Sequence, residues 1–303
     1  MTYFVVDVGG TFIKYALMDD HGNFLEKGKI PTQLNSSDDF IDSLYNLYQN
    51  YPEVSGIAIS SAGVIDSDRG VMHTGGSLDF IENLDIVSLL EERCHVPVTI
   101  ENDAKCAALA ELWKGTLSDC QNAITMVFGT AVGGAVIINR HILKGPDLLA
   151  GEFSYILTDS SDSLNWRKNF AINGGVPALI KSVATAKKRS ENNITGEKIF
   201  EWINEGDYQI LEILREYTHL IAVQIVNLHF IINPEKFAIG GGISERPLFI
   251  QLIQEEVEKL IHSYPFTIPN PKVVACAYHS VSNLVGALYH HLVKVNNFSI
   301  ENV

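Results

Sequence analysis

The chain has 303 residues, a length typical of about two domains at roughly 150 residues each. Hydrophobic residues make up 46% and charged residues 19%, which excludes a wholly disordered chain because there is enough apolar material for two cores. The net charge of −14 and the pI near 5.1 disfavour broad binding to nucleic acid, whose phosphates an acidic surface repels. A nucleotide site would therefore depend on local backbone N–H groups, a metal ion and a few placed cations.

The start of the chain and its longest apolar stretch give no sign of export or membrane insertion. The first ten residues have neither a basic region nor a long apolar region, so we expect no secretory signal. Ile221–Ile232 is interrupted by polar residues and is shorter than the roughly 20 apolar residues that span a bilayer. No Cys-x-x-Cys spacing occurs among the four cysteines, which are Cys94, Cys106, Cys120 and Cys276. We therefore expect reduced thiols, a cytoplasmic location and no membrane partner.

The first half of the chain begins with two β-rich runs around a pair of glycines, which predicts a hairpin. These runs are Tyr3–Val8 and Phe12–Met18, on either side of Gly9-Gly10. Three further strands are predicted from apolar runs at Phe24–Ile30, Val54–Ile59 and Val96–Glu101. Helices are predicted from apolar spacing at Asp38–Tyr51 and from an Ala- and Leu-rich run at Ala104–Gly115.

The second half opens with the same succession of strand, glycine turn and strand. Ala123–Phe128 leads into Gly129-Thr130, and Gly133-Gly134 precedes a predicted strand at Ala135–Asn139. The later predicted elements are helices at Val176–Arg189, Lys198–Asn204 and Tyr208–Ile232, a strand at Lys236–Ile239, a helix at Leu248–Ser263, a strand at Lys272–Ala275 and a helix at Asn283–Val293. The repeated opening predicts two related α/β domains around a cleft, with a boundary near Gly115–Gln121.

The first candidate site motif is Asp7-Val8-Gly9-Gly10-Thr11-Phe12-Ile13-Lys14. Glycines let the backbone approach an anion and offer N–H groups without side-chain obstruction. Thr11 adds a hydroxyl donor, Lys14 has the length to reach a phosphate, and Asp7 at the strand end is a candidate to hold Mg²⁺ through water. The simpler interpretation is a Gly-Gly hairpin turn with a solvated lysine, since short glycine motifs have many false positives.

A second motif, Glu101-Asn102-Asp103-Ala104-Lys105, lies at a predicted junction between strand and helix. Asn and Asp are good N-cap residues, so a helix cap is one interpretation. The other is catalytic, because α/β proteins place reactive groups at strand ends and phosphoryl transfer to a hydroxyl uses a carboxylate that accepts the hydroxyl proton. Asp103 would then be the general base, and Asn102 would hydrogen-bond neighbouring hydroxyls. On the motif alone both interpretations stay open.

Three more motifs follow in the second half. The run Gly129-Thr130-Ala131-Val132-Gly133-Gly134 repeats the chemistry of the first motif, so two turns are candidates to hold a triphosphate from both sides. In Ala150-Gly151-Glu152, the glutamate is a candidate acceptor for two sugar hydroxyls, although most lone glutamates are solvated surface residues. Gly240-Gly241-Gly242 follows a predicted strand and is a candidate platform for a flat ring such as adenine, with a flexible loop as the alternative.

In this order, the motifs D-V-G-G-T-x-x-K, E-N-D-A, G-T-x-x-G-G, A-G-E-F and G-G-G-I-S resemble those of the ROK family (repressors, open reading frames and kinases). The resemblance runs from Asp7 to about Ala287. It implies two RNase H-like α/β domains of the actin-like ATPase type, flanking a central cleft and closing over a sugar so that water is excluded. The first domain would comprise residues 1–117, completed by a C-terminal helix of about 284–303, and the second residues 118–283.

The same resemblance implies roles for individual residues. Asp103 matches the family's catalytic base, Asn102 its sugar-binding neighbour, and Glu152 a ligand of sugar hydroxyls. The other candidates for the sugar site are Gly63, Ser77 and Tyr155. The residues matched to nucleotide binding are Asp7, Gly9, Gly10, Thr11 and Lys14, then Gly129, Thr130, Gly133 and Gly134, and finally Gly240, Gly241 and Gly242 for the adenosine. ATP and Mg²⁺ are the implied cofactors.

The sequence departs from the family pattern in three places. Many members have G-E-F-G-H and then a zinc-binding cysteine cluster, but here Tyr155 replaces the histidine and Leu157–Gly175 has no cysteine, so no zinc is expected. Ser77 occupies the position of an asparagine in typical glucokinases of the family, and its shorter side chain would leave space near the sugar. Only six residues precede Asp7, where the family's repressors carry a DNA-binding region, so a kinase is expected rather than a repressor.

Zinc-free relatives with a similar G-G-S-L segment include kinases that resemble β-glucoside kinase, which phosphorylate the 6-hydroxyl of a glucosyl unit. The leading hypothesis is therefore a cytoplasmic, ATP-dependent kinase for a hexose or β-glucoside. The alternatives are a glucokinase, an N-acetylmannosamine kinase and a catalytically silent sugar-binding regulatory protein. The presence of Asp103 argues against a silent protein, because a sensor needs the pocket but not the base. A homodimer is implied by the resemblance alone, and no nucleic-acid partner is expected.

Overall fold

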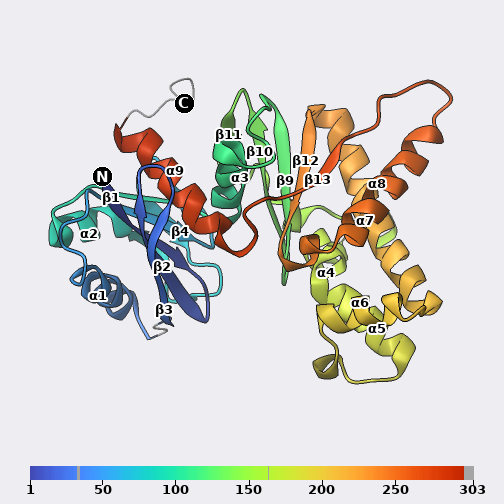
Figure 1. The fold of residues 1–303 in the computed structure, drawn as a ribbon, viewed down its shortest axis with the longest axis horizontal. Helices are drawn as coiled ribbons and strands as arrows, with labels where there is room; N and C mark the ends of the chain where they lie inside the picture. The colour runs from blue at the N-terminus through green and yellow to red at the C-terminus, as the bar shows by residue number, and fades with distance from the viewer. Residues whose placement is uncertain (33–34, 163, 297–303) are drawn as a thin grey trace. The chain divides into compact units, whose positions relative to one another are not determined.

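Two five-stranded β-sheets with the same strand order form the framework of the chain (Figure 1). The computed structural model describes residues 1–32, 35–162 and 164–296, so residues 297–303 of the predicted C-terminal helix lie outside the described part. By their internal contacts the residues fall into two units. Unit 1 comprises Met1–Ser118, Lys144–Ala150 and the chain from Ser280 onward, and unit 2 comprises Asp119–Leu143 and Gly151–His279.

The sheet of unit 1 has the strand order β3-β2-β1-β4-β8. Its strands are β1 (Thr2–Val8), β2 (Phe12–Asp19), β3 (Phe24–Pro31), β4 (Ile57–Ser61) and β8 (Val98–Asn102). Strand β1 is antiparallel to β2 and parallel to β4, and β4 is parallel to β8. The carboxyl ends of β1, β4 and β8 therefore lie at one edge of the sheet.

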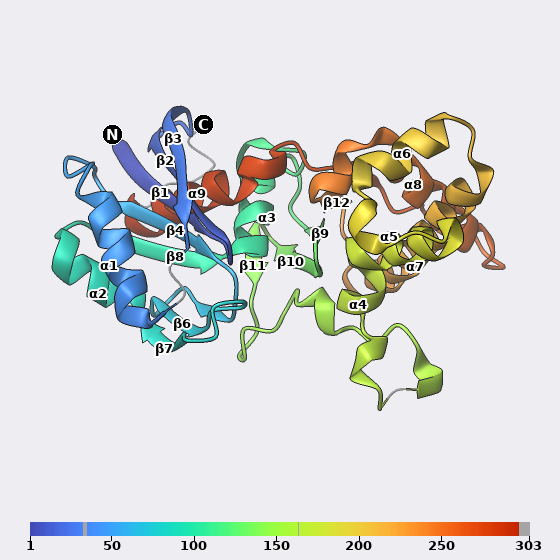
Figure 2. The ribbon, with the colours of Figure 1, turned by 90° about the horizontal axis from the view of Figure 1, so that it is seen from below.

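Helices cover both faces of this sheet (Figure 2). On one face, residues of α1 (Ser37–Tyr48) and α2 (Ile86–Cys94) share a core with Phe4, Val6 and Val8 of β1. On the other face, α9 (Ser282–Asn296) packs against β1, β4 and β8 and along α3 (Asp103–Lys114). Successive residues of a strand point to opposite faces, which is why the β1 residues between those three face α9 instead.

A small antiparallel sheet of β5 (Ile65–Asp66), β6 (Val71–Thr74) and β7 (Glu82–Asp85) follows β4 and leads into α2. Neither these strands nor α2 had been predicted from the sequence. Strands of two to four residues are too short to show alternation, and α2 is positioned by its N-cap Asp85, whose side chain accepts the Ser88 N–H at 3.1 Å.

The sheet of unit 2 has the order β11-β10-β9-β12-β13, which repeats the order of unit 1 when strands are counted from the first strand of each sheet. Its strands are β9 (Ala123–Phe128), β10 (Val132–Ile138), β11 (His141–Leu143), β12 (Lys236–Gly240) and β13 (Val273–Ala275). Its helices are α4 (Phe170–Gly174), α5 (Val176–Lys187), α6 (Gly196–Asn204), α7 (Tyr208–Ile232) and α8 (Pro247–His262). Ile124, Met126 and Phe128 of β9 share one core with residues of α5, α7 and α8.

The predicted α/β class and the repeated strand–turn–strand opening are confirmed. Several predicted boundaries were wrong. Helix α1 ends at Tyr48 rather than Tyr51, because the side chain of Asn50 donates a hydrogen bond to the Leu47 carbonyl at 3.0 Å and caps the last turn. The strand predicted at Val54–Ile59 is β4, Ile57–Ser61. In the part of the chain that the structure describes, no helix is both long and apolar enough to cross a membrane.

Candidate active site

Three parallel strands of unit 1 end side by side, and two of them lead into motifs that the sequence analysis selected. The register pairs Val8 with Ser61 and Ser61 with Asn102, so the chain leaves all three strands at the same edge. Neighbouring strands lie about 4.8 Å apart, so β1 and β8, with β4 between them, are about 10 Å apart. The fold therefore brings the first glycine turn and the Asn102-Asp103 pair to one sheet edge.

Asp7 lies one residue before the end of β1 and is only 7% exposed. Its Oδ1 accepts hydrogen bonds from Ser60 Oγ at 3.1 Å and from Asn283 Nδ2 at 3.0 Å. Its Oδ2 lies 3.5 Å from Nζ of Lys14, the residue directly opposite on β2. The carboxylate is thus held from three elements, and Lys14, which is half exposed, is engaged with Asp7.

The turn after β1 is closed by backbone and side-chain hydrogen bonds. The Gly9 N–H donates to the Phe12 carbonyl at 3.1 Å, and Thr32 Oγ1 donates to the Gly9 carbonyl at 2.6 Å. Gly10 is exposed, and the Ser77 hydroxyl lies so close to it that a Cβ at Gly10 would overlap the Ser77 oxygen. Ser77, a candidate for the sugar site, is therefore a direct neighbour of the first glycine turn.

Asn102 is the N-cap of α3, so the cap interpretation of this motif is correct for Asn102. Its Oδ1 accepts the Lys105 N–H at 3.1 Å, and its Nδ2 donates to the Gly63 carbonyl at 3.0 Å. Gly63 has a φ of 109°, a value that glycine adopts without strain. A primary amide has two N–H donors and two acceptor lone pairs, so Asn102 keeps one of each beyond these two bonds.

Asp103 is the first residue of α3 and is half-buried. Its Oδ1 accepts the Ala104 N–H at 2.8 Å, and the positive end of the helix dipole lies beside its carboxylate. Capping is carried by Asn102, so the Asp103 carboxylate is not the cap of the helix. The geometry leaves the catalytic interpretation of Asp103 as a prediction.

In unit 2 two parallel strands end side by side in the same way, since Val127 of β9 pairs with Gly240 of β12. The Gly129 N–H donates to the Ala131 carbonyl at 3.0 Å and closes a tight turn. Gly241 has a φ of 90°, and a Cβ there would overlap the carbonyl of Phe128 at the end of β9. The Gly129 turn and the Gly240–Gly242 segment are therefore direct neighbours.

The start of α5 supports the Gly129 turn, a feature that the sequence analysis missed. The Val176 N–H donates to the Gly129 carbonyl at 2.9 Å. A Cβ at Gly175, the N-cap of α5, would come within 2.5 Å of the Thr130 carbonyl oxygen. The Gly174-Gly175 pair in the sequence was the available signal, because two glycines before a helix often mark a close backbone approach.

Gly133 and Gly134 lie within β10, where they pair with Val127 and Met126 of β9. The prediction that both glycines precede the strand is therefore wrong. A Cβ at Gly134 would overlap the ring of Phe153, so packing accounts for a glycine here. By contrast, Gly129 has open space around the position of a Cβ. The turn itself therefore spans only about residues 129–131.

The candidate sugar residues of unit 2 lie around a short 3₁₀ helix, Phe153–Tyr155. Glu152 is half-buried directly before it. Ser154 Oγ donates to the Val132 carbonyl at 2.9 Å and fixes the helix on the start of β10. The side chain of Tyr155 is 71% exposed. The sugar-binding roles of Glu152 and Tyr155 stay predictions.

Where the resemblance would place a zinc cluster, hydrogen bonds hold the chain of unit 2. Thr158 donates to the Lys168 carbonyl through both its N–H and its Oγ1, each at 2.8 Å, and Lys168 Nζ lies 3.1 Å from Asp159 Oδ2. Among residues 1–32, 35–162 and 164–296, no group of three or more His, Cys, Asp or Glu side chains is placed to hold a metal.

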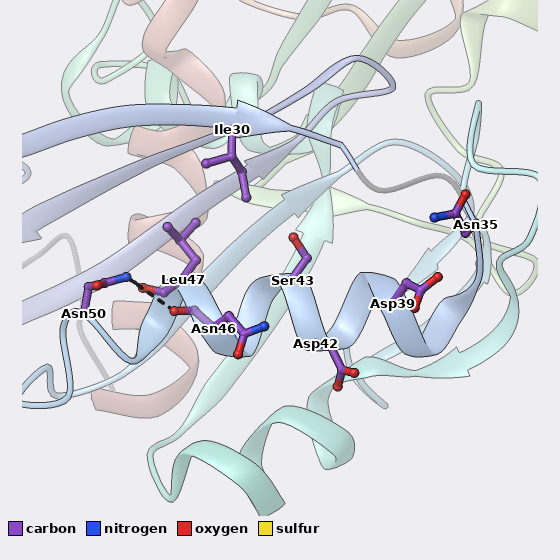
Figure 3. Close-up of a pocket in the computed structure, with 8 residues that line it drawn as sticks. All are labelled: Ile30, Asn35, Asp39, Asp42, Ser43, Asn46, Leu47 and Asn50. Carbon is purple, nitrogen blue, oxygen red and sulfur yellow. Dashed lines mark hydrogen bonds between the residues drawn. The ribbon is translucent and has the colours of Figure 1, made fainter.

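A groove of about 470 Å³ runs along α1 in unit 1 (Figure 3). The residues that line it are Ile30, Asn35, Asp39, Asp42, Ser43, Asn46, Leu47 and Asn50. None of them belongs to a motif that the sequence analysis selected. The groove is open and lies on the helix that covers the sheet, so it is not the site built at the strand ends.

Sequence analysis also missed two partners of Asp7. Ser60 is fully buried in β4, and a polar residue in an otherwise apolar strand was the available signal. Asn283 lies in the first turn of α9, some 276 positions from Asp7, and no local pattern marks such a pairing. Beside them, burial raises the pKa of the Cys106 thiol well above its ordinary value, so this α3 side chain is neutral at pH 7.

Comparison with known proteins gives a consistent picture. The ROK family profile matches residues 3–294. A β-glucoside kinase from Klebsiella pneumoniae is 30% identical over 287 residues, covering 94% of each chain, and one from Listeria monocytogenes is 28% identical, covering 96% of this chain and 97% of its own. A crystal structure of a ROK family protein from Streptococcus pneumoniae in complex with sucrose matches with a TM-score of 0.89 and 29% identity, over 98% of this chain and 100% of the other.

Proposed function

This chain belongs to the ROK family, and we propose that it transfers the γ-phosphoryl group of ATP to a sugar hydroxyl, with Asp103 as the general base. It is a phosphotransferase with an alcohol group as acceptor, the class of its β-glucoside kinase relatives. The observation that supports the proposal most is the shared sheet edge in unit 1. There the turn after β1 and the Asn102-Asp103 pair leave strands that are separated by one strand only.

The chemical step follows from these groups. The oxygen of the sugar hydroxyl forms a bond to the γ-phosphorus, and the Asp103 carboxylate accepts the proton that this hydroxyl loses. The bond from that phosphorus to the β–γ bridging oxygen breaks, and ADP leaves with the electron pair. The Asn102 side chain uses one N–H to bond Gly63 and one lone pair to cap α3. Its second N–H and second lone pair position neighbouring sugar hydroxyls. The Glu152 carboxylate accepts hydrogen bonds from two sugar hydroxyls. The sugar site is completed by Gly63, Ser77 and Tyr155.

The nucleotide is held by backbone. N–H groups at Gly10 and Thr11 in unit 1 contact phosphates, with Lys14 as the cation, and Gly9, whose own N–H donates to the Phe12 carbonyl, shapes the turn. In unit 2 the Gly129-Thr130 turn contacts phosphates, and Gly240–Gly242 pack against the adenosine. Gly134 is needed for packing rather than for phosphate contact, since the Phe153 ring fills the space that a Cβ would need. Gly133 lies beside it in β10.

Asp7 fits an outer ligand of Mg²⁺. One carboxylate, whose Oδ2 also contacts Lys14, does not provide enough ligands to bind the ion alone. Mg²⁺ in kinases keeps several waters, however, and takes its other ligands from the phosphates. When bound, Mg²⁺ would neutralise the negative charge that develops on the phosphate oxygens. Zinc is not part of the proposal, because Tyr155 stands in place of the histidine and Leu157–Gly175 has no cysteine.

The acceptor is proposed to be the 6-hydroxyl of a hexose or β-glucoside. Two relatives are named as β-glucoside kinases, and a structural neighbour was crystallised with a disaccharide. Ser77 is shorter than the asparagine of typical glucokinases in the family, and this supports the proposal of an acceptor larger than a single hexose. A cytoplasmic homodimer without nucleic-acid partners is proposed from the family resemblance and the acidic charge.

The test is ADP release in the presence of ATP, Mg²⁺ and one sugar at a time. The panel contains glucose, mannose, N-acetylmannosamine, fructose and cellobiose. We expect stimulation by cellobiose at least as strong as by glucose. Preference for glucose or N-acetylmannosamine would move the assignment to those kinases. A protein that binds a sugar but releases no ADP with any of them would be a silent sugar-binding protein, and the kinase proposal would fall.

A further inference from the structure

We infer that the buried Glu101 side chain, whose negative charge Lys144 compensates, positions the strand end that carries Asn102 and Asp103 by accepting the Asn102 N–H. The inference rests on the proposed role of Asp103 as the base. Glu101 precedes that pair in the chain but points to the other side of β8 from Asn102, because successive strand residues alternate. It shares a row with Asp7 and Ser60, its counterparts on β1 and β4.

The Glu101 carboxylate is 1% exposed, and each of its oxygens has a defined partner. Oε1 accepts the backbone N–H of Asn102 at 2.8 Å. Oε2 accepts the Ser67 hydroxyl at 2.9 Å and lies 3.2 Å from Lys144 Nζ. One oxygen therefore holds the peptide that leads into Asn102 and Asp103, and the other fixes the carboxylate in place.

Lys144 is the cation that compensates this buried charge. Its side chain is 19% exposed, and its Nζ also contacts the Ser67 hydroxyl and lies 3.7 Å from Asp68 Oδ1. Two further basic groups lie nearby: His290, whose Nδ1 is 4.0 Å from Glu101 Oε2, and Lys294, whose Nζ donates to the carbonyls of Ser67 and Asp68. Burial lowers the pKa of His290 to about 4, so this ring is neutral at pH 7, and Lys294 is bound to backbone carbonyls, whereas Lys144 pairs directly with the Glu101 carboxylate.

Lys144 also begins a short loop that belongs to unit 1, Lys144–Ala150. The loop is closed on itself, since the Ala150 N–H donates to the Lys144 carbonyl at 3.0 Å and the Leu148 N–H to the Gly145 carbonyl at 3.3 Å. Glu152, a proposed sugar ligand, follows Ala150 by two residues. Lys144 thus joins the start of this loop to the strand end before Asn102, within unit 1.

Stability alone does not account for this arrangement. A buried ion pair gains little over apolar side chains of similar size, because removing two charges from water is costly. A carboxylate that is bonded to the adjoining peptide, however, restricts where the next two side chains point. Small displacements of a catalytic group lower rates steeply, by up to about 100-fold for 1 Å.

The test compares two double variants that both remove the ion pair. Glu101→Gln with Lys144→Met keeps an oxygen that accepts the Asn102 N–H, whereas Glu101→Leu with Lys144→Met does not. We expect the Gln/Met protein to keep kcat within about threefold of wild type. The Leu/Met protein should fold with a similar melting temperature but lose about 10- to 100-fold in kcat, with the KM for ATP unchanged. Equal kcat in the two double variants would overturn the inference.

Single variants keep the test decisive if the Leu/Met protein does not fold. Lys144→Met should lower kcat about tenfold, because it leaves the Glu101 carboxylate without this cation. Lys144→Arg keeps a cation at the position and should have a kcat close to that of wild type. The matched control is Lys187→Met, which removes the cation of a half-buried pair with Asp207 in unit 2 and should leave kcat unchanged. Unchanged turnover in Lys144→Met, or an equal loss in the control, would contradict the inference.

A second readout separates this inference from the kinase proposal. Hydrogen exchange of the peptide around Asn102 should be faster in the Leu/Met protein and in Lys144→Met, and wild-type in the Gln/Met protein. This measurement needs no turnover. A wild-type protein that releases no ADP would refute the kinase proposal, while the exchange result would still decide whether Glu101 holds the strand end.

Discussion

Asn102 and Gly63 are joined by a hydrogen bond from the Asn102 side-chain amide to the Gly63 carbonyl, 3.0 Å long. The bond links the end of β8 to the loop after β4, while the same side chain caps α3 through the Lys105 N–H. One residue therefore fixes a helix start and a neighbouring loop together, and the proposed base follows it directly in the chain.

Asn102→Asp separates the cap from the loop contact. Aspartate is an equally good N-cap, so α3 should keep its start, but the buried carboxylate opposes the Gly63 carbonyl and the free energy of unfolding should fall by about 1–3 kcal/mol. The donor to the Gly63 carbonyl is lost, and a second negative charge stands next to Asp103. We expect the KM for the sugar to rise about tenfold or more, as measured by ADP release. An unchanged sugar KM would remove Asn102 from the sugar site.

Asp103→Asn tests the base. Asparagine keeps the size of the side chain and can still accept the Ala104 N–H, so folding and sugar affinity should be retained. It does not accept the hydroxyl proton, so kcat should fall by at least about 10²-fold. Sugar binding is measured by calorimetry and turnover by ADP release. Near-normal turnover would assign the base to another group.

Alanine at Gly129 and Gly134 distinguishes a phosphate turn from a packing position. Gly134→Ala would push a methyl group into the Phe153 ring, so the free energy of unfolding should fall by about 1–3 kcal/mol. Gly129→Ala meets open space, so stability should stay within about 0.5 kcal/mol while the KM for ATP rises. Thermal unfolding and ATP titrations check both. A stable Gly129→Ala protein with wild-type ATP affinity would exclude that turn from nucleotide binding.

Acid should destabilise unit 1 through two buried histidines of α9. Burial lowers the pKa of His290 and of His291 to about 4, against about 6.5 in an unfolded chain. Between those values the unfolded chain binds more protons, so stability is complete above about pH 6.5 and is lost as the pH falls toward 4, by at most about 3 kcal/mol per histidine.

Melting temperature against pH checks this slope. His291→Gln should flatten it, because one of the two groups that must protonate is gone. The control His21→Gln changes a histidine whose side chain is 78% exposed and should leave the slope as in wild type. A melting temperature that is constant from pH 6.5 to 4.5 would contradict the burial argument.

The protein should need no zinc. The chain of unit 2 from Thr158 to Lys168 is joined by hydrogen bonds and an ion pair to Asp159, which a chelator does not affect. We expect elemental analysis to find no stoichiometric zinc and the melting temperature to be unchanged by EDTA, with activity restored by Mg²⁺ alone. A tightly held zinc would show that Leu157–Gly175 was misinterpreted.

The sequence predicted best those features that depend on short local patterns. The strand–glycine–strand openings at Gly9-Gly10 and Gly129 follow from the low steric cost of glycine, and both are confirmed. Gly133 and Gly134 were placed wrongly because a glycine required by a neighbouring ring looks, in sequence, like a glycine required by a turn. Only the position of Phe153 distinguishes the two.

The parts that were missed depend on distant contacts. Lys144 lies between Leu143 and Gly145 in a stretch with no motif, and its partner Glu101 is 43 positions earlier in the chain. Asn283 likewise meets Asp7 only because α9 packs on β1. Such pairings are fixed by the course of the whole chain, and no local spacing in the sequence carries them.

The duplicated sheet has a consequence for how the two halves can change. Counting back two residues from each first glycine, Asp7 in one sheet corresponds to Val127 in the other. Asp7 lies in a row of ionisable and hydroxyl groups, whereas Val127 is paired with Gly240. The same scaffold therefore serves reactive side chains in one copy and bare main chain in the other. Substitution at the first edge should therefore be limited by side-chain chemistry, and at the second edge by side-chain size, since Gly241 has no space for a Cβ.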